Sequence, residues 1–290
     1  VVDAEEPEPL PNFDYKFMQG NSLIESFEGF DLGRISSRLR GGQSKSMQLV
    51  LGIDSHTSRQ NLQRLLREYF SVTDHKKKSS MRQAINEEVK TLIRESIGGT
   101  PASLVKLENM DCSANQDFFL WHTWFKDIFD KGGFDIVIGT PPYGAKIDEH
   151  VKKYLRDNYY SAVSHKKEGL KGSTDTFVVF IELGHRILCN QGYLAFIVPM
   201  SVGSSDALTS LQSIIEKSCS EIKVSSYSNR PKQIFDAACV RTSIFMIKKD
   251  MTPNRHIFTT KLNRRTENLT IKDIIDNLTY VDSKNQKIRS

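Results

Sequence analysis

The sequence of 290 residues has little of what a metal centre or a disulfide framework needs. Its four cysteines form no Cys-x-x-Cys pair, and none of its seven histidines stands at zinc-ligand spacing. No glycine-rich P-loop for nucleotide phosphates occurs either. The sequence therefore predicts no metal site, and its thiols are expected to be reduced and mostly buried, as in a cytoplasmic protein.

Membrane and targeting segments are lacking as well. No apolar run approaches the roughly 18 residues that a membrane-spanning helix needs. The first residues, VVDAEEPEPLP, are acidic and rich in proline, which fits neither a secretory signal nor a transit peptide. They also lack an initiating Met, so the chain is expected to be a fragment of a longer protein.

The composition is typical of a globular protein, with 38% hydrophobic and 26% charged residues. The length allows one large domain or two ordinary ones. The formal net charge is +5. This mild basicity permits a polyanionic partner but does not by itself indicate one.

The second half of the sequence alternates between apolar strands and amphipathic helices. Short apolar runs bounded by turn residues indicate strands, and longer segments with a helical period indicate helices. In chain order we expect a strand at 134–139, a helix at 176–189, a strand at 193–198, a helix at 205–218, and strands at 221–227 and 242–248. This alternation predicts an α/β protein with a mostly parallel sheet.

The first half is expected to be mainly helical. Residues 13–17 alternate like a short strand and lead into a turn. Two amphipathic helices are expected within residues 55–100, and the aromatic segment 118–129 has the period of a helix packed into the core. At the other end of the chain, residues 251–290 are polar and are expected to be a linker or the start of a following domain.

The residues that carry chemistry follow the apolar run FDIVIG at 134–139, which is too short for a helix and is expected to be a buried strand. Thr140-Pro141-Pro142-Tyr143 comes directly after it, where open parallel sheets bind their ligands. The two prolines fix the backbone and remove two donors, so the loop is rigid and presents carbonyl oxygens. A bare Pro-Pro-Tyr turn could merely end a strand, but the preceding strand and Gly139 favour a binding loop.

These groups suit the orientation of an exocyclic amino group on a nucleobase. Such an amine is a poor nucleophile because its lone pair is delocalised into the ring. The side chain of Thr140 and the carbonyl of Pro141 can accept its two hydrogens, which favours the geometry in which the lone pair attacks a methyl sulfonium. Tyr143 can stack on the base once the base is flipped out of the duplex.

The segment FDIVIGTPPY resembles the FDxVIGNPPY segment of N6-adenine DNA methyltransferases, particularly the large restriction–modification enzymes of type IIG. The resemblance extends through FFLWHTWFKDIFDKGGFD, STDTF and NQGYLAFIVP. It implies a partial Rossmann-like class I methyltransferase fold at residues 1–250, with a helical insertion at about 55–100. It also implies S-adenosylmethionine as methyl donor, double-stranded DNA as substrate and the cytoplasm of a prokaryote as location.

Further site residues follow from this resemblance alone. Phe235 corresponds to the phenylalanine that stacks on the face of the flipped adenine opposite Tyr143. Asn21 and Ser22 lie in a turn that resembles the one contacting the adenine of S-adenosylmethionine, and Thr140 also belongs to the implied cofactor site. Target-recognition and nuclease regions are expected elsewhere in the same longer polypeptide.

A basic and aromatic stretch follows the motif and offers a contact for the DNA backbone. Its candidate phosphate ligands are Lys166, Lys167 and Lys171. An exposed, mobile loop without a ligand is an equally good interpretation of the same pattern.

Two departures from the family pattern bear on activity. The family normally has Asn where this chain has Thr140, although related amino-methyltransferases use Ser or Asp there. Because threonine is shorter and β-branched, its oxygen would lie differently, and weaker activity, an inactive natural variant and a deliberate substitution all stay open. The glycine-rich first cofactor motif, expected before residue 13, is also absent from the sequence.

Two alternatives to adenine methylation therefore stand beside it. The chain could be a catalytically silent DNA-binding or scaffold fragment of such an enzyme. It could also methylate N4 of cytosine, which needs the same acceptor geometry on a similar amine. The tyrosine after the two prolines favours adenine.

Overall fold

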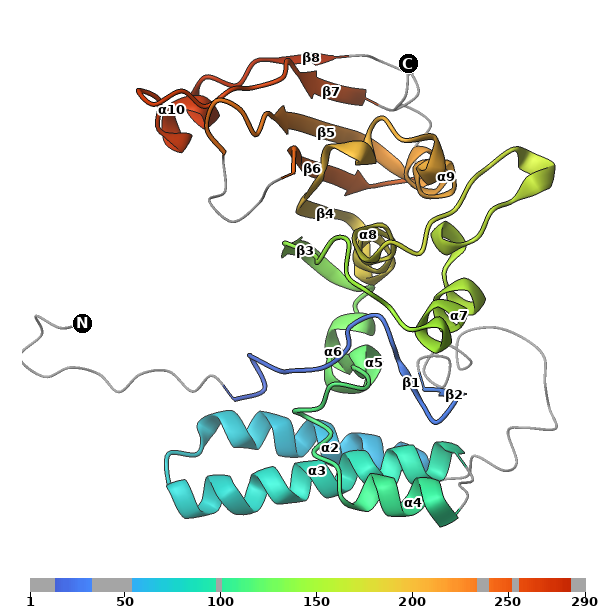
Figure 1. Ribbon diagram of the computed structural model, residues 1–290. Coiled ribbons are helices and arrows are strands. Elements are labelled where there is room, and N and C mark those ends of the chain that lie inside the picture. Colours follow the sequence, from blue (N-terminus) through green and yellow to red (C-terminus); the bar gives the residue numbers. More distant parts are fainter. Residues whose placement is uncertain (1–13, 33–53, 98–100, 234–239, 252–255, 283–290) are drawn as a thin grey trace, which may run out of the picture. The chain divides into compact units, whose positions relative to one another are not determined.

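The computed structural model describes residues 14–32, 54–97, 101–233, 240–251 and 256–282. The chain divides into two compact units, residues 1–126 and residues 127–290. Figure 1 shows their helices and strands coloured along the sequence.

The first unit is built around two long helices, α2 (Asp54–Ser71) and α3 (His75–Ile97), which lie side by side (Figure 1). A shorter helix, α4 (Pro101–Glu108), and a hairpin of β1 (Ser26–Phe27) and β2 (Phe30–Asp31) complete it. The two amphipathic helices predicted for this region are confirmed. Their apolar faces meet in one core, which includes Leu62, Leu66, Tyr69, Ile85, Val89 and Ile93.

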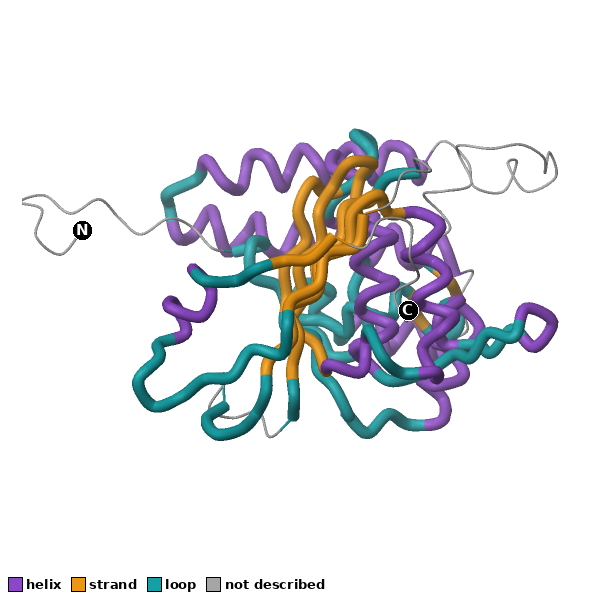
Figure 2. The backbone as a smooth tube through the Cα atoms, turned by 90° about the horizontal axis from the view of Figure 1, so that it is seen from above, coloured by secondary structure: helices purple, strands orange, loops and turns teal. Residues whose placement is uncertain are grey.

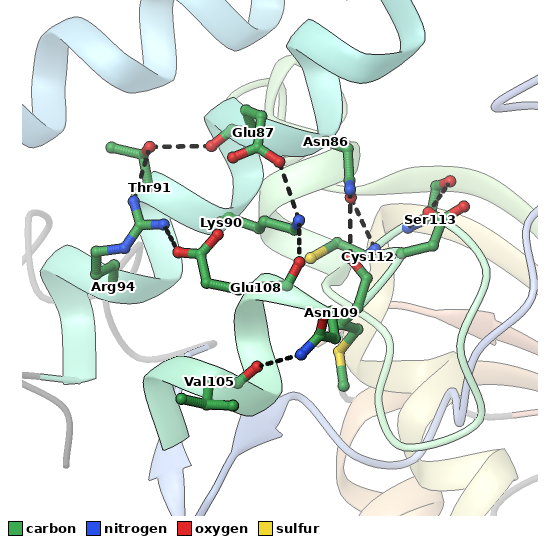
Figure 3. Close-up of polar contacts among 12 residues, drawn as sticks. Asn86, Glu87, Lys90, Thr91, Arg94, Val105, Glu108, Asn109, Cys112 and Ser113 are labelled. Atoms are coloured by element: carbon green, nitrogen blue, oxygen red, sulfur yellow. Dashed lines mark hydrogen bonds and ion pairs between the residues drawn. The ribbon is translucent and has the colours of Figure 1, made fainter. Parts of the chain in front are cut away.

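Polar contacts join α4 and the chain after it to α3 (Figure 3). Lys90 of α3 is buried, and its Nζ donates to the carbonyl of Glu108 (2.7 Å) and to the carboxylate of Glu87 (2.9 Å). Oδ1 of Asn86 accepts from the amide of Cys112 (2.9 Å). These side chains supply partners for backbone groups at and after the end of α4, where a helix leaves its last carbonyls without intrahelical donors.

The strand predicted at residues 13–17 is wrong for its described part. Residues 14–17 form a turn, in which Tyr15 has a φ of 57°, closed by a single bridge between Asp14 and Phe17. The ring of Tyr15 packs edge-on against Tyr69, with 5.1 Å between the ring centroids. This tertiary contact overrides the weak local preference of an alternating pattern.

The aromatic segment 118–129 is predicted as one helix, but it contains two short helical turns, α5 (Trp121–Trp124) and α6 (Lys126–Phe129). Between them Phe125 leaves the helical conformation, with φ −112° and ψ 32°. The aromatic rings of the segment pack on one another at different angles and do not form one stripe along a helix. The predicted burial is confirmed at Phe118 and Trp124.

The second unit is built on a six-stranded sheet with the order β3-β4-β6-β5-β7-β8. The strands are β3 (Phe134–Gly139), β4 (Leu188–Pro199), β5 (Cys219–Tyr227), β6 (Thr242–Lys249), β7 (His256–Thr260) and β8 (Tyr280–Asp282). Four strands point one way, while β6 and β8 run antiparallel to their neighbours. All four predicted strands are confirmed, although β4 begins at Leu188 instead of Tyr193.

Two helices, α8 (Thr176–Ile187) and α9 (Thr209–Ser218), pack on one face of this sheet. Figure 2 views the strands edge-on and shows helices lying along one side of them. On that face apolar side chains recur at every second residue, as Leu194, Phe196 and Val198 do on β4. The core of the second unit therefore lies between the sheet and these two helices.

The first strand, β3, differs from the strand buried on both faces that the sequence predicts. Val137 packs against the core on the side of α8. Ile136 and Ile138, on the opposite face, are 62% and 77% exposed. An apolar run without alternation predicts burial on both faces, but α8 and α9 cover the face with Val137, and the face with Ile136 and Ile138 is exposed.

The sheet also continues past the boundary near residue 250 that the sequence suggests. β7 pairs with β5 in parallel, and β8 pairs with β7. The helix α10 (Ile271–Asp276) begins with a capping box at Thr270, and its Ile274 packs with Tyr227 of β5. The segment expected as a linker thus supplies two strands to the same sheet.

Three cysteines lie in the described ranges, Cys112, Cys189 and Cys219, and all three are free. Burial raises the pKa of Cys112 and of Cys219 to about 12, so these two thiols stay protonated. The prediction of free and mostly buried thiols is confirmed for these residues. Among the described residues no helix is both long enough and apolar enough to cross a membrane.

Candidate active site

The loop Thr140-Pro141-Pro142-Tyr143 leaves the sheet at the carboxyl end of β3, where the sequence predicts it. Thr140 and Pro142 are exposed and Pro141 is buried. Tyr143 is half-buried and packs against the core of the second unit. The loop therefore presents an exposed Thr140 near a tyrosine that is anchored in the core.

Gly139, the last residue of β3, allows this loop to start close to β4. A Cβ added at this position would lie 3.2 Å from the ring of Phe196, which is tighter than an ordinary contact. A larger residue would push either the ring or the strand end aside. Packing against Phe196 therefore explains why a glycine stands directly before the loop.

Two residues at the start of α8 hold the loop on both sides of Tyr143. Oγ1 of Thr176 donates to the carbonyl of Pro142 (2.6 Å). The amide of Gly144 donates to Oδ1 of Asp175 (3.4 Å). Gly144 has a φ of 67°, in the left-handed region that favours glycine, and this lets the chain turn away after the tyrosine.

The turn predicted to contact the cofactor, Asn21 and Ser22, lies in the first unit and has a defined local structure. Oδ1 of Asn21 accepts from the amide of Leu23 (3.3 Å), and the carbonyl of Ser22 accepts from Nε1 of Trp121 (2.9 Å). Just before them, a Cβ on Gly20 would lie 2.5 Å from the carbonyl oxygen of Phe118. The aromatic segment therefore fixes the turn, and only glycine fits at its start.

The predicted site residues are not all brought together by what the structure describes. Asn21 and Ser22 belong to residues 1–126, whereas Thr140 belongs to residues 127–290. Phe235 lies outside the described residues. A shared cofactor site of Asn21, Ser22 and Thr140, and the stacking role of Phe235, stay predictions.

The basic stretch at residues 160–171 forms a loop that is held in shape by ring stacking and backbone hydrogen bonds. The rings of Tyr160 and His165 stack with 3.7 Å between their centroids, and the backbone of His165 exchanges two hydrogen bonds with Leu170 (2.9 and 3.1 Å). Lys171 joins the loop to α9, because its amide donates to Oγ1 of Thr209 (2.7 Å). The rings and backbone bonds fix the shape of the loop.

Lys166, Lys167 and Lys171 are all exposed on this loop. A buried carboxylate sets its base, since Glu182 of α8 accepts from the amides of Tyr160 (3.1 Å) and Ser161 (2.7 Å). The lysines thus project from an anchored support, whether or not they meet a ligand.

Sequence reasoning missed the roles of Thr176 and Glu182. Both pair with backbone groups more than twenty residues earlier in the chain, and no local pattern reports such a contact. A signal for Glu182 does exist, because it is an acid inside the apolar helix TFVVFIELGHRI. A buried carboxylate in such a helix must find donors, and here it finds two backbone amides and the side chain of Arg186.

Comparison with known proteins gives a clear family match. Residues 45–235 match the model of the Eco57I restriction-modification methylase family. A protein of Methanocaldococcus jannaschii, provisionally named a type II restriction enzyme and methyltransferase, is 25% identical over 279 residues. This alignment covers 82% of the chain but only 21% of that relative, so the chain spans about a fifth of its length.

The solved structures that match this chain have low sequence identity and TM-scores below 0.5. A nuclease-deletion mutant of the type ISP restriction-modification enzyme LlaGI, in complex with a DNA substrate mimic, is 14% identical with a TM-score of 0.41, covering 67% of this chain and 19% of that one. The methyltransferase subunit of a type I restriction-modification system from Streptococcus thermophilus is 17% identical with a TM-score of 0.39, covering 66% and 39%.

An α/β sheet with the Thr-Pro-Pro-Tyr loop directly after β3 is the arrangement that the sequence predicts for a methylase. Well over half of the chain matches one family model within that class. The chain belongs to the Eco57I restriction-modification methylase family.

Proposed function

We propose that this chain is the part of a restriction–modification enzyme that moves a methyl group from S-adenosylmethionine to N6 of an adenine in duplex DNA. The observation that carries the proposal is the loop from Thr140 to Tyr143. It follows β3 directly, exposes Thr140 and anchors Tyr143 against the core. Membership of a restriction-modification methylase family supports the reaction class.

The work of the loop is to position an amine. The hydroxyl of Thr140 and the carbonyl of Pro141 accept the two hydrogens of the exocyclic amino group and direct its lone pair toward the methyl donor. Tyr143 stacks on one face of the flipped base, and Phe235 stacks on the other. No covalent intermediate with the enzyme is needed.

The cofactor S-adenosylmethionine supplies an electrophilic methyl group on a sulfonium. Asn21 and Ser22 would hold its adenine, with Thr140 close to the methyl group. The amide of Asn21 supports this assignment, because its bond to Leu23 fixes its orientation and an amide matches the donor and acceptor on the edge of adenine. The donor set of the turn therefore fits the adenine end of the cofactor.

Double-stranded DNA is the proposed partner, with Lys166, Lys167 and Lys171 on its phosphates. Three exposed cations on an anchored loop support this, because phosphate contacts position a duplex over a reacting site. Residues 1–250 would form part of the catalytic domain, with the helices near 55–100 as an insertion. Target-recognition and nuclease regions of the same polypeptide would complete the enzyme.

A methyl-transfer assay tests this proposal. The natural full-length protein is incubated with tritiated S-adenosylmethionine and unmethylated DNA, and label in the DNA is counted. We expect transfer by the natural protein and faster transfer by the Thr140→Asn variant, because an asparagine amide reaches the amine better than a threonine hydroxyl. If neither the natural protein nor the variant transfers label to the DNA, the proposed reaction is contradicted.

One observation favours a second candidate, a catalytically silent DNA-binding protein. Thr140 stands where the resembling enzymes have asparagine, so the pocket could bind a base without methylating it. Under this candidate the assay gives label with Thr140→Asn only. Both proteins would then bind duplex DNA with equal affinity.

A further inference from the structure

We infer that Asp175 and Thr176, which we call the α8 clamp, position Tyr143 for stacking on the target base. The consequence for catalysis rests on the proposed function, whereas the contacts themselves do not. Neither residue reaches the reacting atoms in this scheme, so both are positioning residues.

The α8 clamp fixes the backbone immediately before and after the tyrosine. Thr176 donates to the carbonyl of Pro142, which precedes Tyr143, at 2.6 Å. Asp175 accepts from the amide of Gly144, which follows Tyr143, at 3.4 Å. With both flanking peptides held and its side chain packed on the core, Tyr143 has little freedom to rotate.

The loop cannot hold itself in this way. Pro141 and Pro142 have no backbone N–H, so two donors that would close a tight turn are missing. Without those two donors, the carbonyls of the loop and the amides on either side of the prolines are the backbone groups left to anchor it. The α8 clamp engages two of these groups, the carbonyl of Pro142 and the amide of Gly144.

Asp175 contacts Gly144 and does not cap its own helix. It is the N-cap residue of α8, where an aspartate commonly accepts from an amide of the first helical turn. Its side chain makes no such capping bond. Its carboxylate is directed to Gly144 instead, as expected if holding the loop is its task.

The clamp is itself rigid. Thr176 is only 7% exposed, and most residues of α8 are buried in the core of the second unit. The carbonyl of Asp175 also accepts from the amides of Val178 (3.0 Å) and Val179 (3.3 Å). The position of Tyr143 is therefore fixed through a well-packed helix, a support that precise sites commonly need.

Hydrogen–deuterium exchange tests the contact without DNA or cofactor. Thr176→Val keeps the shape of the side chain and removes the hydroxyl, and Thr176→Ser keeps the hydroxyl as a matched control. We expect exchange of the Gly144 amide, which Asp175 holds, to rise by about tenfold in the valine variant and to stay near the natural rate in the serine variant. Equal exchange in all three proteins would overturn the clamp.

Steady-state kinetics of the full-length protein test the consequence. We expect Thr176→Val to lower kcat by roughly 10- to 100-fold with KM for DNA nearly unchanged, and Thr176→Ser to restore kcat. Faster exchange with an unchanged kcat, or equal losses in both variants, would overturn the positioning role. If the natural protein transfers no methyl group at all, the proposed function fails, and exchange alone decides whether the clamp exists.

Discussion

At the scale of single residues, the proposed chemistry depends on the flat face of Tyr143. Replacing it with alanine removes the stacking surface, and stacking of a base on an aromatic ring contributes about 1–3 kcal/mol. We expect Tyr143→Ala to lower kcat/KM for DNA by about 10- to 100-fold. Tyr143→Phe should keep most of the activity, because its ring stacks as well.

Tyr193 provides the matched control for this prediction. It is also a tyrosine, 44% exposed, on β4, where it pairs with Ile136, four residues before the loop begins at Thr140. Tyr193→Ala should leave kcat/KM near the natural value. An alanine at position 143 that does no more harm than the one at 193 would argue against stacking by Tyr143.

The residues of this loop could be predicted from the sequence because their signal is local. A short apolar run followed by Thr140-Pro141-Pro142-Tyr143 predicts a strand and a rigid loop within ten residues. The support from Thr176 could not be predicted in this way, because it pairs with Pro142 from 34 residues away. A threonine at the start of a helix has many uses, and the sequence does not say which one applies.

At the scale of elements, the polar contact between α3 and the end of α4 depends on the buried ammonium group of Lys90. Lys90 has a side chain that is 6% exposed, and it bonds to the carbonyl at the end of α4. Lys90→Met keeps the apolar stem but leaves that carbonyl without its donor. We expect a loss of about 1–3 kcal/mol in the free energy of unfolding, measured by urea denaturation.

The same substitution at Lys77, an exposed lysine of α3, is the control for Lys90. Lys77→Met should change the free energy of unfolding by less than about 0.5 kcal/mol. Equal effects at the two positions would show that burial of Lys90 contributes nothing special.

The loop that carries Lys166, Lys167 and Lys171, which we call the lysine loop, leads to a prediction about how DNA affinity depends on salt concentration. Each phosphate contact by a cation contributes about 0.9 to the slope of log affinity against log salt concentration. Replacing Lys166 and Lys167 with glutamine should therefore lower that slope by up to about 1.8, measured by fluorescence anisotropy on duplex DNA. The matched pair Lys76 and Lys77, also adjacent and exposed, should leave it unchanged.

If both double variants change the slope equally, the lysine loop has no particular position on the DNA. If neither does, Lys166 and Lys167 contact no phosphate. Either result would return the loop to the second interpretation of its sequence, an exposed segment without a ligand.

The positions of helices and strands were predicted better than the burial of their faces. Periodicity places α2, α3, α8 and the four strands predicted in the second unit correctly because it reports one buried face. It fails for β3, where Ile136 and Ile138 are apolar yet exposed, because an apolar residue says nothing about which neighbour covers it. It also fails at 118–129, where dense aromatic residues imitate a helical period.

At the scale of the whole molecule, stability should fall in mild acid because of one histidine. Burial, together with the nearby cations Lys249 and Arg186, lowers the pKa of His185 from 6.5 to about 4. Its Nε2 lies 2.8 Å from Oγ of Ser218. The folded protein thus holds His185 neutral in a range of pH where the unfolded chain would protonate it.

The direction follows from linkage. Above about pH 6.5 both states hold the histidine neutral, so this contribution to stability is complete. Between about pH 6.5 and pH 4 the unfolded chain takes up the proton first, and stability falls by about 3 kcal/mol in all. Below about pH 4 the folded protein is protonated too, and the loss from this group levels off.

Urea denaturation at several pH values measures this effect. His185→Gln should flatten the fall between pH 6.5 and 4, whereas His150→Gln, at an exposed position of α7 (Glu149–Asn158), should not. Parallel pH curves for the natural protein and His185→Gln would contradict the assignment.

The central claim is that the loop from Thr140 to Tyr143 presents adenine for methylation at N6. The most direct measurement is to digest DNA methylated by the full-length protein, or by its Thr140→Asn variant, to nucleosides and identify the product by mass spectrometry. We predict N6-methyldeoxyadenosine, formed about 10- to 100-fold more slowly with Tyr143→Ala. N4-methyldeoxycytidine in its place, or no methylated nucleoside from either protein, would contradict the account.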